Sequence, residues 1–122
     1  MKNAINWFEI PAKDFARATR FYGAVVGAPL QHVPMGPIDM GFFPADEGGV
    51  GGAVVCGPDA HPAQGGTLVY LNANPDLSGA LGRVAAAGGT VIVPKTEISP
   101  EFGFFALFTD TEGNTVGLHS GA

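Results

Sequence analysis

The sequence predicts an α+β domain made of two tandem βαβββ modules, and three observations support this. The 19 glycines and 10 prolines among 122 residues divide the chain into short segments, which is untypical of a bundle of long helices. Hydrophobic residues make up 46% of the chain, enough apolar surface to form a core. The chain also repeats itself: a shift of 62 residues aligns Gly41-Phe42-Phe43 with Gly103-Phe104-Phe105. The same shift aligns Asp14 with Asp76, Ala18 with Ala80, Ala24 with Ala86, Gly27 with Gly89 and Val54 with Val116.

The first module, residues 1–58, shows its elements in order. The apolar run Ile5–Ile10 is short enough for a strand. Asp14 can cap a helix whose apolar residues recur at helical spacing, and Gly27 stands where such a helix should end. Three short extended runs follow at residues 29–33, 40–43 and 50–56.

A linker at residues 59–65 leads to the second module, residues 66–122, which repeats this order. Asn74 can cap its helix with Pro75 at the first helical position, and Gly88 and Gly89 can end it. The extended runs are residues 91–93, 104–109 and 116–119, and we expect Lys95-Thr96-Glu97 to lie in a surface loop.

Charge and composition exclude several classes of function. Six basic and 11 acidic residues give a net charge of −5 without any basic cluster, so we expect no nucleic-acid partner and no anionic membrane surface. No stretch approaches the roughly 20 apolar residues of a membrane span, and the start lacks the apolar region of a signal peptide. Cys56 is the one cysteine and cannot form an intrachain disulfide, which fits a cytoplasmic protein.

A set of short motifs runs through nearly the whole chain in a fixed order. They are Phe8-Glu9-Ile10-Pro11, Asp14-Phe15, Arg17-Ala18, Phe21-Tyr22, Ala86-Ala87-Gly88-Gly89, Pro94-Lys95-Thr96, Phe105-Ala106-Leu107-Phe108 and the turn Asp110-Thr111-Glu112-Gly113-Asn114. In this order and spacing the chain resembles the vicinal oxygen chelate superfamily, which includes glyoxalase I, extradiol dioxygenases and bleomycin-resistance proteins. The resemblance implies that the two modules form a cupped half-barrel sheet with a small-molecule cavity. It also implies a homodimer.

The resemblance implies four positions for metal ligands, which metal-binding members fill with His or Glu on the first and last strands of each module. Here these positions hold Trp7 and Val69 on the first strands, Gly117 on the last strand, and Gly51 or Gly52 as its counterpart. None of these side chains can coordinate a hard cation. We therefore expect no metal cofactor.

One alternative keeps a metal at a displaced site. Glu9 and His119 each lie two residues beyond a vacated position, so strand alternation directs both side chains into the same cavity. Two donors are too few for a divalent cation unless Cys56, His32 or water contributes.

The function expected from these residues is the binding of a small apolar or aromatic molecule in a metal-free cup. The expected lining residues are Trp7, Glu9, Val69, Leu71, Gly117 and His119. A second hypothesis is a lyase, isomerase or dioxygenase-type enzyme that uses displaced ligands or Glu9 as general base. A third is a partner subunit without chemistry of its own. Each side chain also has a structural interpretation: Trp7 as a core or interface residue, Glu9 as a rim carboxylate, and His119 as a solvated strand end.

Overall fold

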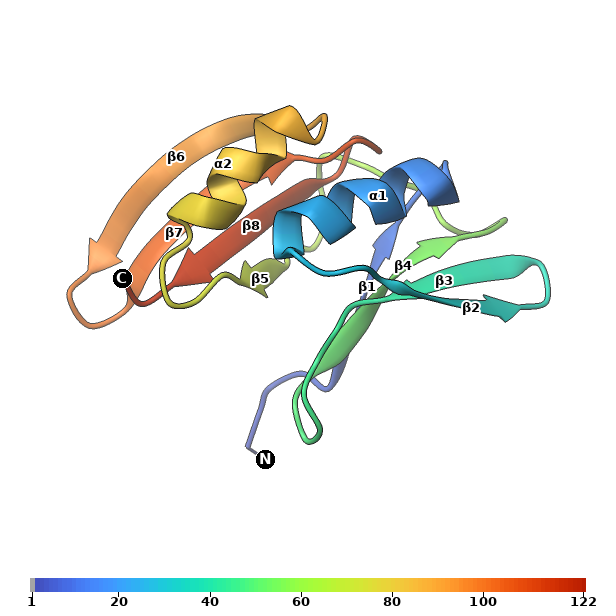
Figure 1. The fold of residues 1–122 in the computed structure, drawn as a ribbon, viewed down its shortest axis with the longest axis horizontal. Coiled ribbons are helices and arrows are strands. Elements are labelled where there is room, and N and C mark those ends of the chain that lie inside the picture. Colours follow the sequence, from blue (N-terminus) through green and yellow to red (C-terminus); the bar gives the residue numbers. More distant parts are fainter. Residues whose placement is uncertain (1) are drawn as a thin grey trace.

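Each half of the chain forms a four-stranded mixed sheet with one helix, as the computed structural model of residues 2–122 shows (Figure 1). Module one contains β1 (Trp7–Pro11), α1 (Phe15–Val26), β2 (Gln31–Met35), β3 (Ile38–Phe42) and β4 (Gly51–Cys56). Module two contains β5 (Tyr70–Asn72), α2 (Ser78–Ala86), β6 (Thr90–Ser99), β7 (Gly103–Thr109) and β8 (Thr115–Ser120). The order of elements confirms the predicted α+β fold with two βαβββ modules.

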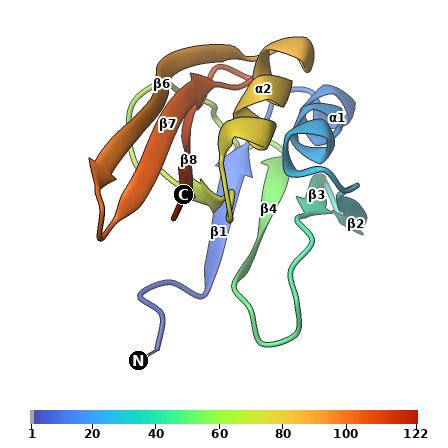
Figure 2. The ribbon, with the colours of Figure 1, turned by 60° about the vertical axis from the view of Figure 1, so that its left-hand side comes forward.

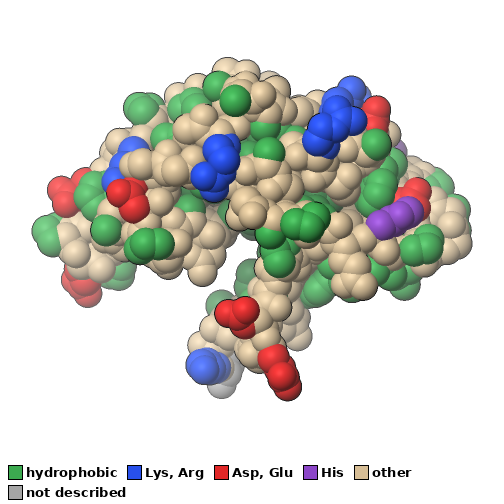
Figure 3. All heavy atoms as spheres, viewed as in Figure 1, with side chains coloured by type: hydrophobic (Ala, Val, Ile, Leu, Met, Phe, Trp, Pro, Cys, Tyr) green, Lys and Arg blue, Asp and Glu red, His purple; other side chains and the backbone are tan. Residues whose placement is uncertain are grey.

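The two sheets have the same topology. Their strand orders are β1-β4-β3-β2 and β5-β8-β7-β6, and in each the first strand runs parallel to the last while the other pairs are antiparallel. The two helices lie side by side in both ribbon views and cover one side of the sheets (Figures 1 and 2). The opposite side is hollowed in the space-filling view (Figure 3). We call this open side the concave face.

The hydrophobic core lies between the helices and the sheets and joins the two modules. Phe21 and Tyr22 of α1, Val84 of α2, Phe108 of β7 and Leu118 of β8 are all buried within one cluster. The rings of Phe21 and Phe108 have centroids 5.8 Å apart and so connect α1 directly with the sheet of module two. Among residues 2–122, the structure has no helix that is long and apolar enough to cross a membrane.

Helix α1 begins and ends at the residues predicted from the sequence. The carboxylate of Asp14 accepts the backbone N–H of Arg17 at 3.0 Å and caps the first turn. Gly27 has φ of 80°, a left-handed conformation that ends the helix at low cost for glycine. Gly88, with φ of 106°, ends α2 in the same way.

Helix α2 begins later than predicted, at Ser78. The side chain of Asn74 does not cap it, because its Oδ1 atom accepts the N–H of Gly121 at 2.8 Å. Leu77 is the N-cap residue and has no side-chain cap, while the carboxylate of Asp76 accepts the N–H of Ser78 at 2.9 Å. This bond and one from Lys95 Nζ lower the pKa of the Asp76 carboxyl.

The segment Lys95-Thr96-Glu97 was predicted to be a loop, and that prediction is wrong. The three residues lie within β6, which is ten residues long and pairs with β7 along its length. Register shifts interrupt the pairing between Val91 and Val93 and between Val93 and Thr96. The second of these shifts spans Pro94, which has no N–H to donate and is tolerated because β6 is an edge strand of the sheet.

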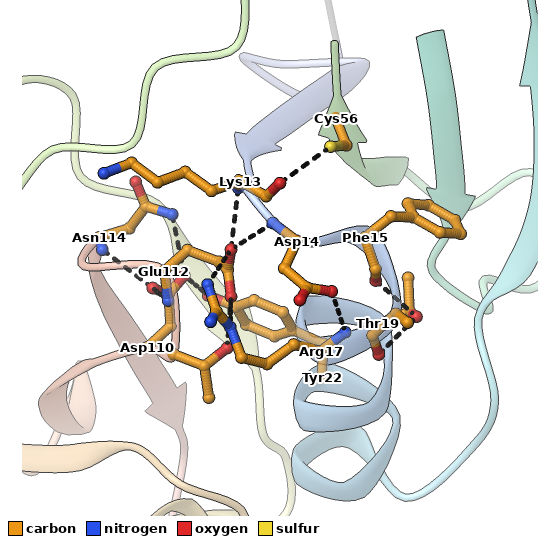
Figure 4. Close-up of polar contacts among 12 residues, drawn as sticks. Lys13, Asp14, Phe15, Arg17, Thr19, Tyr22, Cys56, Asp110, Glu112 and Asn114 are labelled. Atoms are coloured by element: carbon orange, nitrogen blue, oxygen red, sulfur yellow. Dashed lines mark hydrogen bonds and ion pairs between the residues drawn. The ribbon is translucent and has the colours of Figure 1, made fainter.

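The turn at residues 110–114 fastens module two to the start of α1 (Figure 4). The carboxylate of Glu112 accepts the backbone N–H groups of Lys13 and Asp14, each at 2.8 Å, and the Arg17 Nε–H at 2.7 Å. Burial alone would raise the pKa of Glu112, but these hydrogen bonds outweigh it and lower the pKa to about 2. Next to this site, the hydroxyl of buried Tyr22 donates to Asp110 at 2.6 Å.

Candidate functional site

Each module places an aromatic ring over a glycine on the concave face. Phe8 and Ile10 of β1 and Leu71 of β5 pack into the core. Because neighbouring side chains of a strand point to opposite faces, Trp7 and Tyr70 lie on the other face. Trp7 is 41% exposed and pairs with Gly51, and Tyr70 is 47% exposed and pairs with Gly117. The two rings therefore lie on equivalent positions of the two sheets.

The two glycines make room for these rings. A Cβ atom at Gly117 would overlap the ring of Tyr70. A Cβ atom at Gly51 would come within 3.2 Å of Trp7 Cζ3, a tight contact. The absence of a side chain on the last strand of each sheet lets the neighbouring aromatic ring lie against the backbone.

A second aromatic residue accompanies each ring. Phe42 lies edge-on to Trp7, with ring centroids 5.2 Å apart, and Phe105 lies edge-on to Tyr70 at 6.4 Å. Phe42 pairs with Ala53, and Phe105 pairs with the equivalent residue His119, so the two phenylalanines also correspond. We call each set of two rings and one glycine an aromatic platform: Trp7, Phe42 and Gly51 in module one, and Tyr70, Phe105 and Gly117 in module two.

The polar groups beside the two platforms differ. In module one, Glu9 Oε2 accepts the indole N–H of Trp7 at 3.2 Å, and the pairing partner of Glu9 is Ala53. In module two, the equivalent of Glu9 is Asn72, which pairs with His119. His119 Nε2 lies 2.7 Å from the backbone carbonyl oxygen of Phe102. A carboxylate therefore borders one platform and an imidazole the other.

Three hollows adjoin these residues. The module-two platform borders a pocket of about 430 Å³ lined by Tyr70, Ile98, Phe105 and His119. Glu9 borders two smaller pockets, of about 220 Å³ beside His61 and about 290 Å³ beside Ile38. One of these pockets is thus largely aromatic, and the other two border a carboxylate.

Four of the six residues expected to line the cup lie on the concave face: Trp7, Glu9, Gly117 and His119. The structure differs from the expectation at Leu71 and Val69. Leu71 is only 6% exposed and belongs to the core, and Val69 packs against that core just before β5. Tyr70 occupies the position equivalent to Trp7 instead, because the true offset between the first strands is one residue longer than the sequence alignment indicated.

Sequence reasoning missed Tyr70 and Ile98 as site residues. The signal for Tyr70 was the strand alternation around buried Leu71, which places Tyr70 opposite the core. Ile98 carried no such signal, because the residues beside it were assigned to a loop. The structure also decides between the two candidate glycines: Gly51 pairs with Trp7, whereas a Cβ atom at Gly52 would overlap the core residue Phe8.

The residues on the concave face do not fit a divalent metal ion. Within residues 2–122, no three His, Cys, Asp or Glu side chains come together as a ligand set. Two of the suggested helpers have other partners: the Sγ–H of Cys56 donates to the carbonyl of Lys13 at 3.4 Å, and His32 pairs with Asp39 at 2.7 Å.

Comparison with known proteins agrees with this architecture. The family model described as the glyoxalase/bleomycin resistance protein/dioxygenase superfamily matches residues 4–118. A glyoxylase-like domain-containing protein from Didymella fabae is 32% identical over 121 residues, covering 91% of this chain and 88% of that protein.

Solved structures with this fold include two described as glyoxalase/bleomycin resistance proteins. The one from Albidiferax ferrireducens T118 has a TM-score of 0.68 at 19% identity, with 95% of this chain and 97% of that chain covered. The one from Streptomyces sp. CB03234 has a TM-score of 0.62 at 24% identity, with 93% and 97% covered. The match of the family model over nearly the whole length, together with the duplicated βαβββ topology, shows that the chain belongs to the glyoxalase/bleomycin resistance protein/dioxygenase superfamily.

Proposed function

We propose that this protein binds a small apolar or aromatic molecule on its concave face without a metal ion. The observation that carries the proposal is the pair of aromatic platforms, in which Trp7 and Tyr70 lie against glycines and remain 41% and 47% exposed. Large aromatic rings held open to solvent stabilise a flat ligand by stacking and by the burial of apolar surface. The platforms occupy the strands from which metal-binding relatives would supply ligands, so stacking replaces coordination there.

The proposal is tested with the single tryptophan of the chain. Because Trp7 is the only tryptophan and belongs to the module-one platform, its fluorescence reports on a ligand bound at that platform. We expect 2-naphthol, used as a planar aromatic probe, to change the Trp7 emission in a saturable manner. A linear response equal to that of free N-acetyltryptophanamide would contradict the proposal.

Metal content provides an independent test of the metal-free site. We expect elemental analysis of the purified protein to find well below one equivalent of Ni, Zn, Fe or Mn per chain. About one equivalent of any of these metals would overturn this part of the proposal. The platform residues would then need a different interpretation.

We also infer that the protein is a homodimer located in the cytoplasm. Exposed apolar side chains on several elements support a second copy as partner, among them Met35 on β2, Ile92 on β6 and Phe102 after β6, which are 50–62% exposed. The free thiol of Cys56 suits a reducing compartment. Sedimentation equilibrium should give twice the mass of one chain, and a monomer at micromolar concentration would rule out a stable dimer.

A second candidate function is an enzyme of the same superfamily with Glu9 as general base. The specific observation in its favour is the hydrogen bond from the Trp7 indole to Glu9, which holds one carboxylate oxygen beside the module-one platform. If this candidate is correct, Glu9→Gln abolishes turnover of a substrate while the free energy of unfolding and ligand affinity stay unchanged. Unaltered turnover in Glu9→Gln would exclude Glu9 as the base.

A further inference from the structure

The two aromatic platforms differ in one residue that can select a ligand. Because Phe42 pairs with Ala53 and Phe105 pairs with His119, the position of the His119 imidazole is filled by a methyl group in module one. The aromatic rings are duplicated, whereas the imidazole is present beside the module-two platform only. His119 lines the pocket of about 430 Å³ together with Tyr70, Ile98 and Phe105.

A backbone carbonyl determines which nitrogen of His119 a ligand can use. Nε2 lies 2.7 Å from the carbonyl oxygen of Phe102, and a carbonyl oxygen only accepts hydrogen bonds. Nε2 therefore carries the hydrogen, and in the neutral imidazole Nδ1 is then an acceptor. Among residues 2–122, no donor forms a hydrogen bond with Nδ1. His119, which lines the pocket, therefore carries an acceptor that no donor among residues 2–122 occupies.

We propose that this pocket recognises a neutral planar aromatic molecule that carries a hydroxyl or N–H donor, which His119 Nδ1 accepts. The proposal rests on the proposed function and deepens it by naming the chemical class of the ligand. Tyr70 and Phe105 contact the ring of the ligand, and Gly117 lets the Tyr70 ring lie against β8. The four lining residues include no carboxylate, lysine or arginine, so a charged ligand would lose hydration there without gaining an ion pair.

The hydroxyl of Tyr70 does not provide the same selection. A phenol both donates and accepts, so Tyr70 tolerates a ligand with either kind of polar group. His119, with its one acceptor fixed by Phe102, favours a donor. A matched pair of ligands that differ only in this donor therefore isolates the role of His119.

The test compares 2-naphthol with 2-methoxynaphthalene, which has the same rings but no donor. In the wild-type protein we expect 2-naphthol to bind more tightly by roughly threefold to tenfold, the net effect of one hydrogen bond. His119→Leu should remove this preference, and His119→Gln, which keeps an acceptor oxygen, should retain part of it. His32→Leu is the matched control, because His32 pairs with Asp39, lies against the tilted ring of Phe15 and does not line the pocket.

The outcomes separate this inference from the proposed function. If both naphthalenes bind with equal affinity, the inference is overturned while the proposed function stands. If neither binds, both are overturned. A preference for 2-naphthol that persists in His119→Leu also overturns the inference.

Nuclear magnetic resonance keeps the inference testable if His119→Leu fails to fold. The chain has three histidines, so the ¹⁵N resonances of the His119 ring can be assigned in the wild-type protein. We expect Nε2 to be the protonated nitrogen and the Nδ1 resonance to shift when 2-naphthol is added, but not with 2-methoxynaphthalene. An Nδ1 resonance that does not respond to 2-naphthol would overturn the proposal.

Discussion

Single glycines shape the candidate site because each one sets where an aromatic ring can lie. Gly117 has no room for a Cβ atom, which would overlap Tyr70, whereas at Gly51 the closest ring atom is 3.2 Å from such an atom. Both glycines lie in regular strands, so the constraint comes from the neighbouring ring and not from the backbone conformation. The two positions therefore respond differently to the same small substitution.

Gly117→Ala should displace the Tyr70 ring and weaken ligand binding. We expect the affinity for 2-naphthol to fall by roughly tenfold, the energy of about one aromatic contact. Because Tyr70 is 47% exposed and can swing outward, the free energy of unfolding should fall by only about 1 kcal/mol. Gly51→Ala is the matched control and should have a smaller effect on both; equal losses in the two variants would contradict the difference in space.

Glu112 is the second residue whose change has a defined consequence. Its carboxylate accepts hydrogen bonds from two backbone N–H groups at the start of α1 and forms an ion pair with Arg17. Glu112→Gln should therefore lower the free energy of unfolding by about 2 kcal/mol at pH 7. Urea unfolding measures this difference. Glu101→Gln, at an exposed residue, is the control and should be neutral.

The pKa of Glu112 also predicts how this contribution depends on pH. Folding lowers the pKa from 4.5 to about 2, so the stabilisation is fully present above pH 4.5 and is lost as the pH falls towards 2. The difference in stability between wild type and Glu112→Gln should therefore shrink over this range. A difference that is constant from pH 7 to pH 2 would show that the charge of Glu112 is not what stabilises the turn.

At the scale of elements, helix α1 is held at both ends by groups that belong to module two. The start of α1 is bound by the turn at residues 110–114, and its last turn by Arg83 of α2. Arg83 Nε and its terminal nitrogen Nη2 donate to the carbonyls of Ala24 and Val25, each at 2.9 Å. A cation at a helix C-terminus is favourable because the last carbonyls are unpaired and carry partial negative charge.

Arg83→Met should remove the two hydrogen bonds that connect α2 to the last turn of α1. The substitution keeps much of the apolar stem but removes both donors, and we expect the free energy of unfolding to fall by about 1–2 kcal/mol. Thermal and urea unfolding measure the loss. Arg83→Lys retains the charge with a single donor group and should recover part of it; a variant Arg83→Met as stable as wild type would show that these bonds contribute nothing.

At the scale of the whole molecule, the two modules share one core. The buried cluster contains Phe21 and Tyr22 from module one together with Leu77, Phe108 and Leu118 from module two. Neither module alone could cover these side chains, so each would expose them to water. The chain should therefore behave as a single cooperative unit.

This shared core predicts one unfolding transition. Differential scanning calorimetry of residues 1–122 should show a single peak whose calorimetric and van't Hoff enthalpies agree. Residues 1–58 and 66–122, expressed separately, should each lack a cooperative transition. A cooperative transition in either fragment would mean that the module is an independent folding unit.

The order and many of the ends of the helices and strands could be predicted from hydrophobic periodicity and turn residues, because these signals act locally. Asp14 and Gly27 mark the two ends of α1 through contacts within a few residues, and the structure shows both where they were expected. The start of α2 was missed because Asn74 is drawn to Gly121, a partner 47 residues away in sequence. Long-range hydrogen bonds of this kind leave no trace in local pattern.

The sequence by itself determined the duplicated βαβββ order and the family, since both depend on residue type and spacing. Only the tertiary structure decided which residues share the concave face. Strand pairing placed Tyr70, and not Val69, over Gly117, and it set His119 beside Phe105. A shift of one residue reverses the face on which a strand side chain lies, and that register is set by hydrogen bonds between distant segments. The residues that line the pocket are therefore decided by strand pairing and not by sequence spacing.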